Sequence, residues 1–287
     1  MSESRVAATP NGRESACLVS KPTSVEARFG LHSCNPRDGD SHTDIQLDTW
    51  ALDDRGQVQA GVLALLADHT LGEVPYLLRP PATWSVTTEL TLDFVRPVEP
   101  GEALHAWATP TRMEQGGGLV HGVVTDTDES AVALATTRCV FVPAKSEVPL
   151  APVAGVNTRK SATSITEHLG LTRSHTDDGA GVHLDDVSGW VNDFGILHGG
   201  IWACMAEIAG SEAIAAQNPA LSTAQIHTLY FRSGLPGASV SLEASVVHMG
   251  RRFAVAQVSG RTADGTLCTL STVTARFVED FAPTTNA

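Results

Sequence analysis

The stretch GILHGGIWACMAEIAGSEAI, residues 195–214, decides the fold of this chain. It opens on a His-Gly-Gly triplet and continues as an almost wholly apolar run that carries one early acid, Glu207. A run that is apolar on nearly every side predicts a helix buried on most of its faces. A buried carboxylate is costly unless it is paired or protonated. Glu207 therefore needs either a partner or a function.

The same unit occurs earlier in the chain. The stretch GQVQAGVLALLADHTLG, residues 56–72, aligns with the opening of the first one, so that Gln59 falls on His198 and Asp68 falls on Glu207. An internal repeat indicates two copies of one structural unit. Because an acid recurs at the matching place, chance is a poor explanation for either carboxylate.

Runs typical of strands follow each of the two helices. They alternate apolar and polar residues and are rich in Val and Thr, as half-buried antiparallel strands are. These runs lie at 88–110 and 119–142 in the first half and at 226–247 and 253–278 in the second. The expected fold class is therefore α+β, with two tandem domains that each wrap an antiparallel sheet around a long central helix.

The domain boundaries follow from composition. A segment rich in Pro, Ser and Ala separates the halves and is typical of a linker. We expect a partly disordered N-terminal tail over 1–44, domains over 45–145 and 165–280, a linker over 146–164 and a C-terminal tail over 281–287.

Composition excludes several classes of partner. The 287 residues carry 19 basic and 32 acidic side chains, a net charge of −13, which argues against binding nucleic acid. No apolar run approaches the roughly 20 residues that span a bilayer, and the N-terminus lacks the apolar core of a secretory signal. Cys139, Cys204 and Cys268 lie in apolar stretches, so we expect reduced core thiols and a cytoplasmic protein.

Helix geometry separates each acid from the start of its own helix. From Gly199 to Glu207 the axial rise is about 12 Å, because an α-helix rises 1.5 Å per residue. A small electrophile at the helix N-terminus can meet an acid only from another helix, and the sequence supplies two. If the halves pack as a pseudo-twofold pair, each helix start faces the acid of the other helix. The free N–H groups at a helix N-terminus can stabilise a developing oxyanion. A carboxylate from the other helix can activate water or attack the electrophile directly. Together these groups predict hydrolysis of an activated acyl compound.

The second half carries an Asn, a His-Gly-Gly triplet that begins six positions later and an acid nine positions after the His, at Asn192, His198, Gly199, Gly200 and Glu207. This pattern resembles the hotdog-fold acyl-CoA thioesterases of the phenylacetate-pathway (PaaI-like) type. The resemblance covers both halves and implies a tandem double-hotdog chain. It implies an acyl-CoA substrate, with coenzyme A as part of that substrate and no other cofactor and no metal. Hotdog units often pair again, so a homo-oligomer is expected.

The resemblance also implies roles for individual residues. The N–H of Gly199 would hold the thioester carbonyl, and Asp68 with the strand hydroxyl of Thr87 would come from the opposing half. Asn192 and His198 complete this site.

The reverse site would pair Gln59 and Ala60 with Glu207 and Thr223. It departs from the pattern, because Asp53 stands where the family has Asn and Gln-Ala-Gly replaces His-Gly-Gly. Our hypothesis is one working site, with Asp68 as nucleophile or general base, and a second site that is impaired or adapted. Glu207 stays a second catalytic candidate. Candidate substrate-binding residues are Gly200, Thr223, Arg96, Arg251 and Arg252, the arginines for the phosphates of coenzyme A.

Plainer interpretations stay open for each residue. Asp68 can pair locally with His69, His198 can be a buried structural histidine, and Asn192 can hold a turn. Thr87 and Thr223 can be ordinary strand residues, and the arginines can be merely solvated. The rival function is a non-catalytic protein that binds or senses acyl-CoA.

Overall fold

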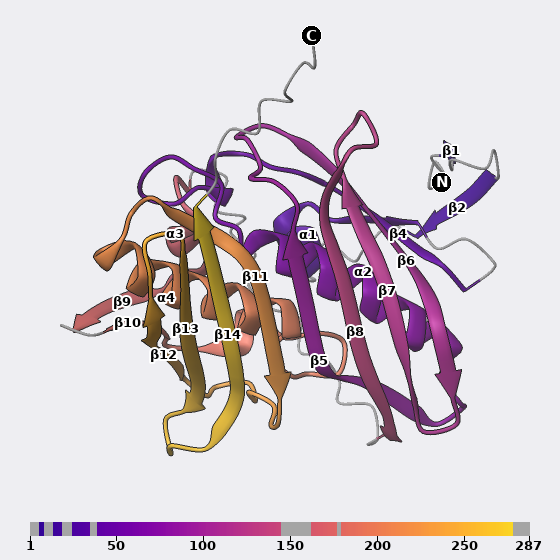
Figure 1. The fold of residues 1–287 in the computed structure, drawn as a ribbon. Helices are drawn as coiled ribbons and strands as arrows, with labels where there is room; N and C mark the ends of the chain where they lie inside the picture. The colour runs from indigo at the N-terminus through magenta and orange to yellow at the C-terminus, as the bar shows by residue number, and fades with distance from the viewer. Residues whose placement is uncertain are drawn as a thin grey trace, which may run out of the picture.

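The computed structural model describes residues 6–8, 14–18, 25–34, 39–144, 162–176 and 179–277. In this part of the chain, 14 antiparallel strands form one sheet, and two long helices pack on one face of it (Figure 1). The tail expected over 281–287 lies outside the described residues, as do most of the segment before residue 25 and the linker expected over 146–164 as far as residue 161. The last linker residues, 162–164, are described, and Ala162 is buried, so the linker ends earlier than expected.

The elements of the first half are β1 (Val6–Ala8), β2 (Glu14–Leu18), α1 (Val25–Phe29), β3 (His32–Cys34), β4 (Ser41–Gln46), the 3-10 turn η1 (Thr49–Ala51), α2 (Val62–Leu78), β5 (Thr83–Phe94), β6 (Ala103–Glu114), β7 (Gly117–Thr125) and β8 (Ala131–Pro143). Those of the second half are α3 (Ile165–Leu169), β9 (Thr172–Thr176), β10 (Gly179–Leu184), η2 (Val187–Trp190), α4 (Gly199–Gln217), β11 (Leu221–Tyr230), β12 (Val240–Met249), β13 (Phe253–Thr262) and β14 (Leu267–Phe277).

The repeat begins earlier than the sequence indicated. The series α1, β3, β4, η1, α2 of the first half recurs as α3, β9, β10, η2, α4 in the second. The tail expected over 1–44 is therefore wrong for its last part: Val25, Phe29 and Leu31 are buried in the core, and β4 pairs with β6. These residues were missed because their apolar side chains are too few and too scattered to show a period.

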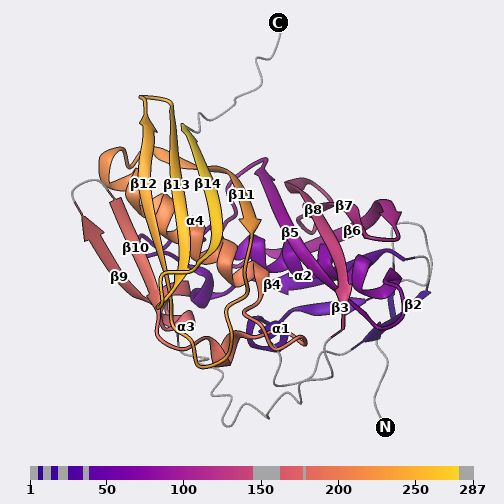
Figure 2. The same cartoon turned by 90° about the horizontal axis from the view of Figure 1, so that it is seen from below.

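The two halves join edge to edge through β5 and β11. These strands pair antiparallel, with Leu92 opposite Ile226, and the order β4-β6-β7-β8-β5 on one side mirrors β11-β14-β13-β12-β10 on the other. Seen from below, α2 and α4 lie side by side against this joint (Figure 2). The sheet therefore runs through both halves as one layer.

The two helices cross at their N-terminal ends, and glycines allow it. A Cβ on Gly61 would lie 2.9 Å from the carbonyl oxygen of Cys204, and one on Gly200 would lie 2.8 Å from the Cα of Leu65. Each of these glycines touches the opposing helix one turn before that helix's acid. The start of each helix is therefore placed beside the acid of the other.

The cysteines divide into two kinds. Cys139, Cys204 and Cys268 are free and buried, as expected for core thiols, whereas Cys34 is disulfide-bonded, which the sequence did not indicate. Among the described residues, no helix is both long and apolar enough to cross a membrane.

Candidate active site

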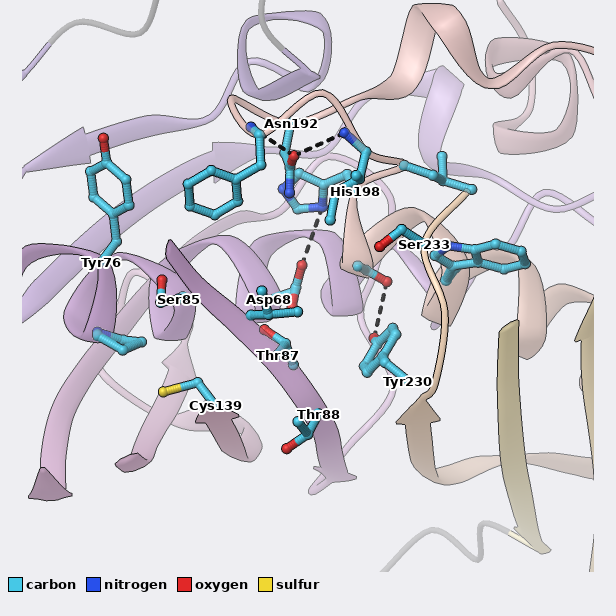
Figure 3. Close-up of a pocket in the computed structure, with 18 of the residues that line it drawn as sticks. Asp68, Tyr76, Ser85, Thr87, Thr88, Cys139, Asn192, His198, Tyr230 and Ser233 are labelled. Atoms are coloured by element: carbon cyan, nitrogen blue, oxygen red, sulfur yellow. Dashed lines mark hydrogen bonds and ion pairs between the residues drawn. The ribbon is translucent and has the colours of Figure 1, made fainter. Parts of the chain in front are cut away.

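Asp68 of α2 lies at the start of α4. It is 8% exposed, and its Oδ2 accepts a hydrogen bond from the N–H of Gly200 at 2.7 Å. His198 Nδ1 lies 3.2 Å from the same oxygen (Figure 3). A Cβ on Gly199 would lie 2.8 Å from Oδ2, so only glycine fits there. The structure therefore brings Asp68 together with the His-Gly-Gly triplet, across the joint between the two halves.

The carbonyl oxygen of Gly199 accepts a hydrogen bond, whereas its N–H has no acceptor among the described residues. Tyr230 donates its hydroxyl to the Gly199 carbonyl oxygen at 3.0 Å. Burial, and to a lesser degree the charge of Asp68, raises the pKa of Tyr230, so the phenol stays a donor. Among the described residues, no group accepts a hydrogen bond from the Gly199 N–H. This N–H is therefore available to an oxyanion at the positive end of α4.

A cavity of about 300 Å³ opens at this point and is lined by Asp68, Thr87, Asn192, His198 and Gly199. Its walls are partly aromatic, from Tyr76 and Phe194, whose ring stacks on Trp84 at 4.8 Å. Thr87 lies below Asp68 in Figure 3 and comes from β5. We call this space the Asp68 cavity.

Cys139 is the thiol of the Asp68 cavity. Burial raises the pKa of the Cys139 thiol, so it stays protonated and is a poor nucleophile. Asp68, rather than this thiol, therefore stays the candidate reactive group of the cavity.

Asn192 holds the loop that precedes α4. Its Oδ1 accepts from the N–H of Phe194 at 3.0 Å and from that of Ile196 at 3.4 Å. Asp53 does the same before α2, where its Oδ1 accepts two backbone N–H groups. Because both residues make the same turn, the exchange of Asn for Asp does not distinguish the two sites chemically, and the turn-holding interpretation of Asn192 is supported.

A second cavity, of about 390 Å³, contains the matching residues of the reverse site, Gln59, Ala60, Glu207 and Thr223. Glu207 is 1% exposed, and protein donors occupy both of its oxygens. Oε1 accepts from Thr223 Oγ1 at 2.5 Å, and Oε2 accepts from Gln59 Nε2 at 2.5 Å and from the Gly61 N–H at 2.9 Å. Burial raises the pKa of Glu207 against these hydrogen bonds.

The strand hydroxyls sit at matching irregularities of the sheet. The pairing of β5 with β8 shifts just after Thr87, and that of β11 with β14 shifts just after Thr223. Such bulges re-aim side chains, which explains why one hydroxyl from each half turns into a cavity. Thr223 bonds its acid, whereas among the described contacts Thr87 does not bond Asp68.

The three arginines predicted to bind the phosphates of coenzyme A differ in their positions and partners. Arg96 lines the second cavity, but its guanidinium is bonded to Glu102 at 2.9 Å and Asp126 at 2.7 Å, which raises the pKa of Arg96. Arg251 and Arg252 lie in the turn between β12 and β13 and are not among the residues that line either cavity.

Arg232, which was not among the residues predicted from the sequence, lines the Asp68 cavity. It is exposed, donates to the Phe231 carbonyl oxygen and pairs with no carboxylate in the described part of the chain. The internal repeat could have predicted Arg232, because Arg232 aligns with Arg96.

Two further residues of the cavity were missed. Glu26 reaches it from α1, and His69 follows Asp68 on α2. Burial lowers the pKa of His69, but Glu26, together with Glu73 and Asp68, outweighs burial, and the net pKa is raised. No sequence pattern links Glu26 to this place, because α1 was assigned to the tail.

Two thioesterase family models match parts of this chain. Residues 194–269 match the family model of the thioesterase superfamily, and residues 3–141 match that of the acyl-CoA thioesterase C-terminal domain. A solved hotdog-fold protein of unknown function from Alicyclobacillus acidocaldarius superposes with a TM-score of 0.60 at 11% identity, covering 91% of this chain and 99% of that one. The chain has the hotdog fold.

Two further solved structures have nearly the same extent as this chain. A TesB protein of Mycobacterium avium subspecies paratuberculosis gives a TM-score of 0.64 at 13% identity, covering 89% of this chain and 98% of that one. The acyl-CoA thioesterase II TesB2 of Mycobacterium marinum gives 0.59 at 11% identity, covering 90% and 99%. No curated protein sequence matches the chain. Thioesterase family models therefore match both halves of this hotdog protein.

Proposed function

We propose that this chain hydrolyses acyl-CoA thioesters in the Asp68 cavity. The observation that carries the proposal is the contact of Asp68 on α2 with the N-terminus of α4, where a backbone N–H is left uncommitted beside the acid. A carboxylate and an oxyanion donor that face one space are the two groups that ester or thioester hydrolysis needs. The thioesterase family models that match both halves support the same reaction class.

In the proposed reaction the thioester carbonyl oxygen accepts the Gly199 N–H. Asp68 takes a proton from a water molecule, and the water oxygen attacks the carbonyl carbon. The tetrahedral oxyanion is stabilised at the helix N-terminus, where the dipole is positive. Its collapse breaks the C–S bond, and the coenzyme A thiolate leaves and takes up a proton. The Gly200 N–H donates to Asp68 Oδ2 and is shared with His198 Nδ1, which leaves Asp68 Oδ1 for the water.

Coenzyme A would enter past Arg232. This guanidinium is the uncommitted positive charge of the described cavity wall, and phosphates favour arginine because of its bidentate geometry. The acyl group would extend toward Tyr76 and Phe194, whose rings form the apolar side.

We further propose that each half is one hotdog unit of the phenylacetate-pathway type and that the site is composite, with Asp68 from one unit and the His-Gly-Gly triplet from the other. The shared element order, with α2 and α4 at matching places, supports this arrangement. Pairing of two such chains stays a prediction, which light scattering after gel filtration would test.

The experiment is thiol release from a panel of aromatic and aliphatic acyl-CoAs, with wild type, Asp68→Asn and Glu207→Gln side by side. We expect Asp68→Asn to lower kcat by about 10²- to 10⁴-fold, the usual contribution of a general base. Glu207→Gln is the matched control, since it alters the corresponding acid of the other cavity. Loss of turnover in Glu207→Gln alone would move the reaction to the second cavity.

A single turnover in ¹⁸O-labelled water separates the two roles of Asp68. A general base delivers the water oxygen directly, so the first equivalent of acid product carries ¹⁸O. A nucleophilic Asp68 would instead place its own unlabelled oxygen in that first product. Tight acyl-CoA binding with no turnover on any member would favour the rival function, a binding protein.

A further inference from the structure

The Asp68 cavity continues along one face of α2. The residues of α2 that line it are Asp68, His69, Gly72, Glu73, Pro75 and Tyr76. Asp68, Gly72 and Tyr76 follow one another at intervals of four residues, which places them on a single face of the helix. An α-helix rises 1.5 Å per residue, so Tyr76 lies about 12 Å further along the axis than Asp68. We call the part of the cavity between these two residues the α2 arm.

Small residues give the α2 arm its width. A Cβ on Gly72 would meet no atom within 4 Å, so the space beside this residue is open. Ser85 of β5 and Cys139 of β8 line the cavity on the side of the sheet, and Ser85 lies between Tyr76 and Asp68 in Figure 3. Glycine within a helix is destabilising relative to alanine, because it loses more conformational freedom on folding. Gly72 therefore weakens α2, and what it provides is room beside the helix.

An aromatic group stands at the far end of the α2 arm. The ring of Phe194 lies 6.0 Å from the ring of Tyr76 and stacks on Trp84 at 4.8 Å. The guanidinium of Arg79 lies over the Tyr76 ring, 3.8 Å from its centroid, and donates to the carbonyl oxygens of Tyr76 and Thr83. Because Arg79 is held by the backbone and contacts the face of the ring, the phenol of Tyr76 is fixed in place. It is therefore a firm end to the arm.

The distance between the acid and the ring sets a length for a ligand in the arm. Of the roughly 12 Å along the helix, a carbon chain leaves about 4 Å for van der Waals contact with the ring. Carbon–carbon bonds of about 1.5 Å advance an extended chain by about 1.25 Å each. The remaining distance of about 8 Å therefore accommodates about six carbons beyond the carbonyl carbon.

We infer that Gly72 and Tyr76 select unbranched acyl chains of about six to eight carbons, Gly72 by leaving space beside α2 and Tyr76 by ending that space. This inference rests on the proposed function, because it takes the thioester carbonyl to lie at the N–H of Gly199. Each methylene that enters the arm should raise kcat/KM about 3- to 4-fold, since it leaves water for an apolar surface. Carbons beyond the ring of Tyr76 find no further room and add nothing.

The second half of the chain supplies a matched control. On α4 the positions that correspond to Gly72 and Tyr76 are Ser211 and Ala215. Ser211 lines the cavity of Glu207, and its Oγ accepts a hydrogen bond from Gln59 at 3.1 Å. The repeat therefore has a hydroxyl where α2 has no side chain and a methyl group where α2 has a ring. A large side chain at Ser211 fills the other cavity and leaves the α2 arm as it is.

The experiment is a series of straight-chain substrates from butyryl-CoA to palmitoyl-CoA, with kcat/KM measured at each length. Tyr76→Ala should move the optimum to chains about three to four carbons longer, the length of the ring. Tyr76→Phe keeps the ring and should keep the optimum. Gly72→Leu should lower kcat/KM for octanoyl-CoA about 10- to 60-fold and leave that for butyryl-CoA within about 3-fold. Ser211→Leu should keep the profile of wild type, and thermal melting checks that each variant folds.

The inference is overturned if Tyr76→Ala or Gly72→Leu, once shown to fold, keeps the profile of wild type, or if Ser211→Leu shifts it. Turnover with an unshifted profile would refute this inference while leaving the proposed function intact. If wild type hydrolysed no member of the series, the proposed function would fail instead. Dissociation constants of the same acyl-CoAs, from titration calorimetry of the same variants, would then decide the inference: the same optimum and shifts would support it, and a flat series would overturn it.

Discussion

The two buried acids of this molecule, Asp68 and Glu207, occupy matching positions on matching helices but have different surroundings. Both accept an N–H from the glycine at the start of the opposing helix, at 2.7 Å and 2.9 Å. Glu207 is one methylene longer, and Thr223 and Gln59 occupy its oxygens. Asp68 keeps one oxygen without a protein donor among the described contacts. Equivalent backbone positions therefore hold two acids of different availability. We call Glu207, whose two oxygens both accept hydrogen bonds, the committed acid, and we call Asp68 the available acid.

The difference extends to the arginines. Arg96 near the Glu207 cavity is neutralised by two carboxylates, whereas its repeat counterpart Arg232 has none in the described part of the chain. Both copies of the repeat thus keep the scaffold, while only one copy keeps the available acid and the arginine without a carboxylate partner that the proposed function uses.

After the substitution of Asp68 itself, the largest expected effect is on Gly199, the glycine beside the available acid. Gly199→Ala places a Cβ 2.8 Å from Asp68 Oδ2, which displaces the carboxylate and blocks the approach of a carbonyl. We expect kcat to fall about 10²- to 10³-fold, the loss typical of a missing oxyanion donor. Steady-state kinetics on the best acyl-CoA measure it. Ala60→Gly at the matching place should leave kcat unchanged, and a strong effect there would break the asymmetry.

Substitutions at the helix crossing test what the two halves share. Gly61→Ala and Gly200→Ala each push a Cβ into opposing backbone, so each should lower the free energy of unfolding by about 1–3 kcal/mol. Gly72→Ala is the control, because a Cβ there meets nothing within 4 Å. It should stabilise α2 by about 0.5–1 kcal/mol, the usual gain from Gly to Ala within a helix. Urea titrations measure the free energy of unfolding of all three variants. If only one of Gly61 and Gly200 tolerated Ala, the two helix starts would not be equally tightly packed.

The arginine pair separates substrate binding from stability. Arg232→Gln should raise KM for acyl-CoA about 10-fold, since a charge-assisted phosphate contact is lost, and should leave the melting temperature unchanged. Arg96→Gln should lower the melting temperature without changing KM, because it leaves Glu102 and Asp126 unpaired. Kinetics and melting curves of both variants measure this. The same rise of KM in both variants would show that coenzyme A does not distinguish the two cavities.

The smallest effect concerns the committed acid. Because burial raises the pKa of Glu207 in the folded chain, folding favours its protonated form. Its contribution to stability is then greatest below the unfolded pKa of about 4.3 and is lost as pH rises through the folded pKa. The free energy of unfolding of wild type, taken relative to Glu207→Gln, should therefore decrease from pH 4.5 to pH 7.5. Urea unfolding at both pH values measures the difference, and an increase would mean that the hydrogen bonds outweigh burial.

Much of the fold could be read from local pattern. Strand alternation predicted the runs that became β7 and β8 and those that became β13 and β14, and the apolar repeat predicted α2 and α4 within a few residues. The helical rise alone required that Gly199 meet an acid from another helix. These inferences hold because periodicity and rise are properties of a short window of chain.

The contacts of the site were harder to predict. The network of Gln59, Glu207 and Thr223 joins residues far apart in the chain, and nothing in the sequence indicated that both oxygens of Glu207 would be occupied. Arg232 was predictable from the repeat but was overlooked, whereas Glu26 was not, because α1 has no pattern of its own.

By itself, the sequence of this protein determined the two-copy plan, the strand and helix types and the candidate acids, because these depend on residue order within each element. Only the tertiary structure decided which acid is free, which arginine is unpaired and which residues of α1 reach the cavity. Those properties depend on how side chains from distant segments share hydrogen-bond donors and space after packing. One extra methylene, in Glu207 against Asp68, or one exchanged side chain, Gln59 against His198, is enough to change them.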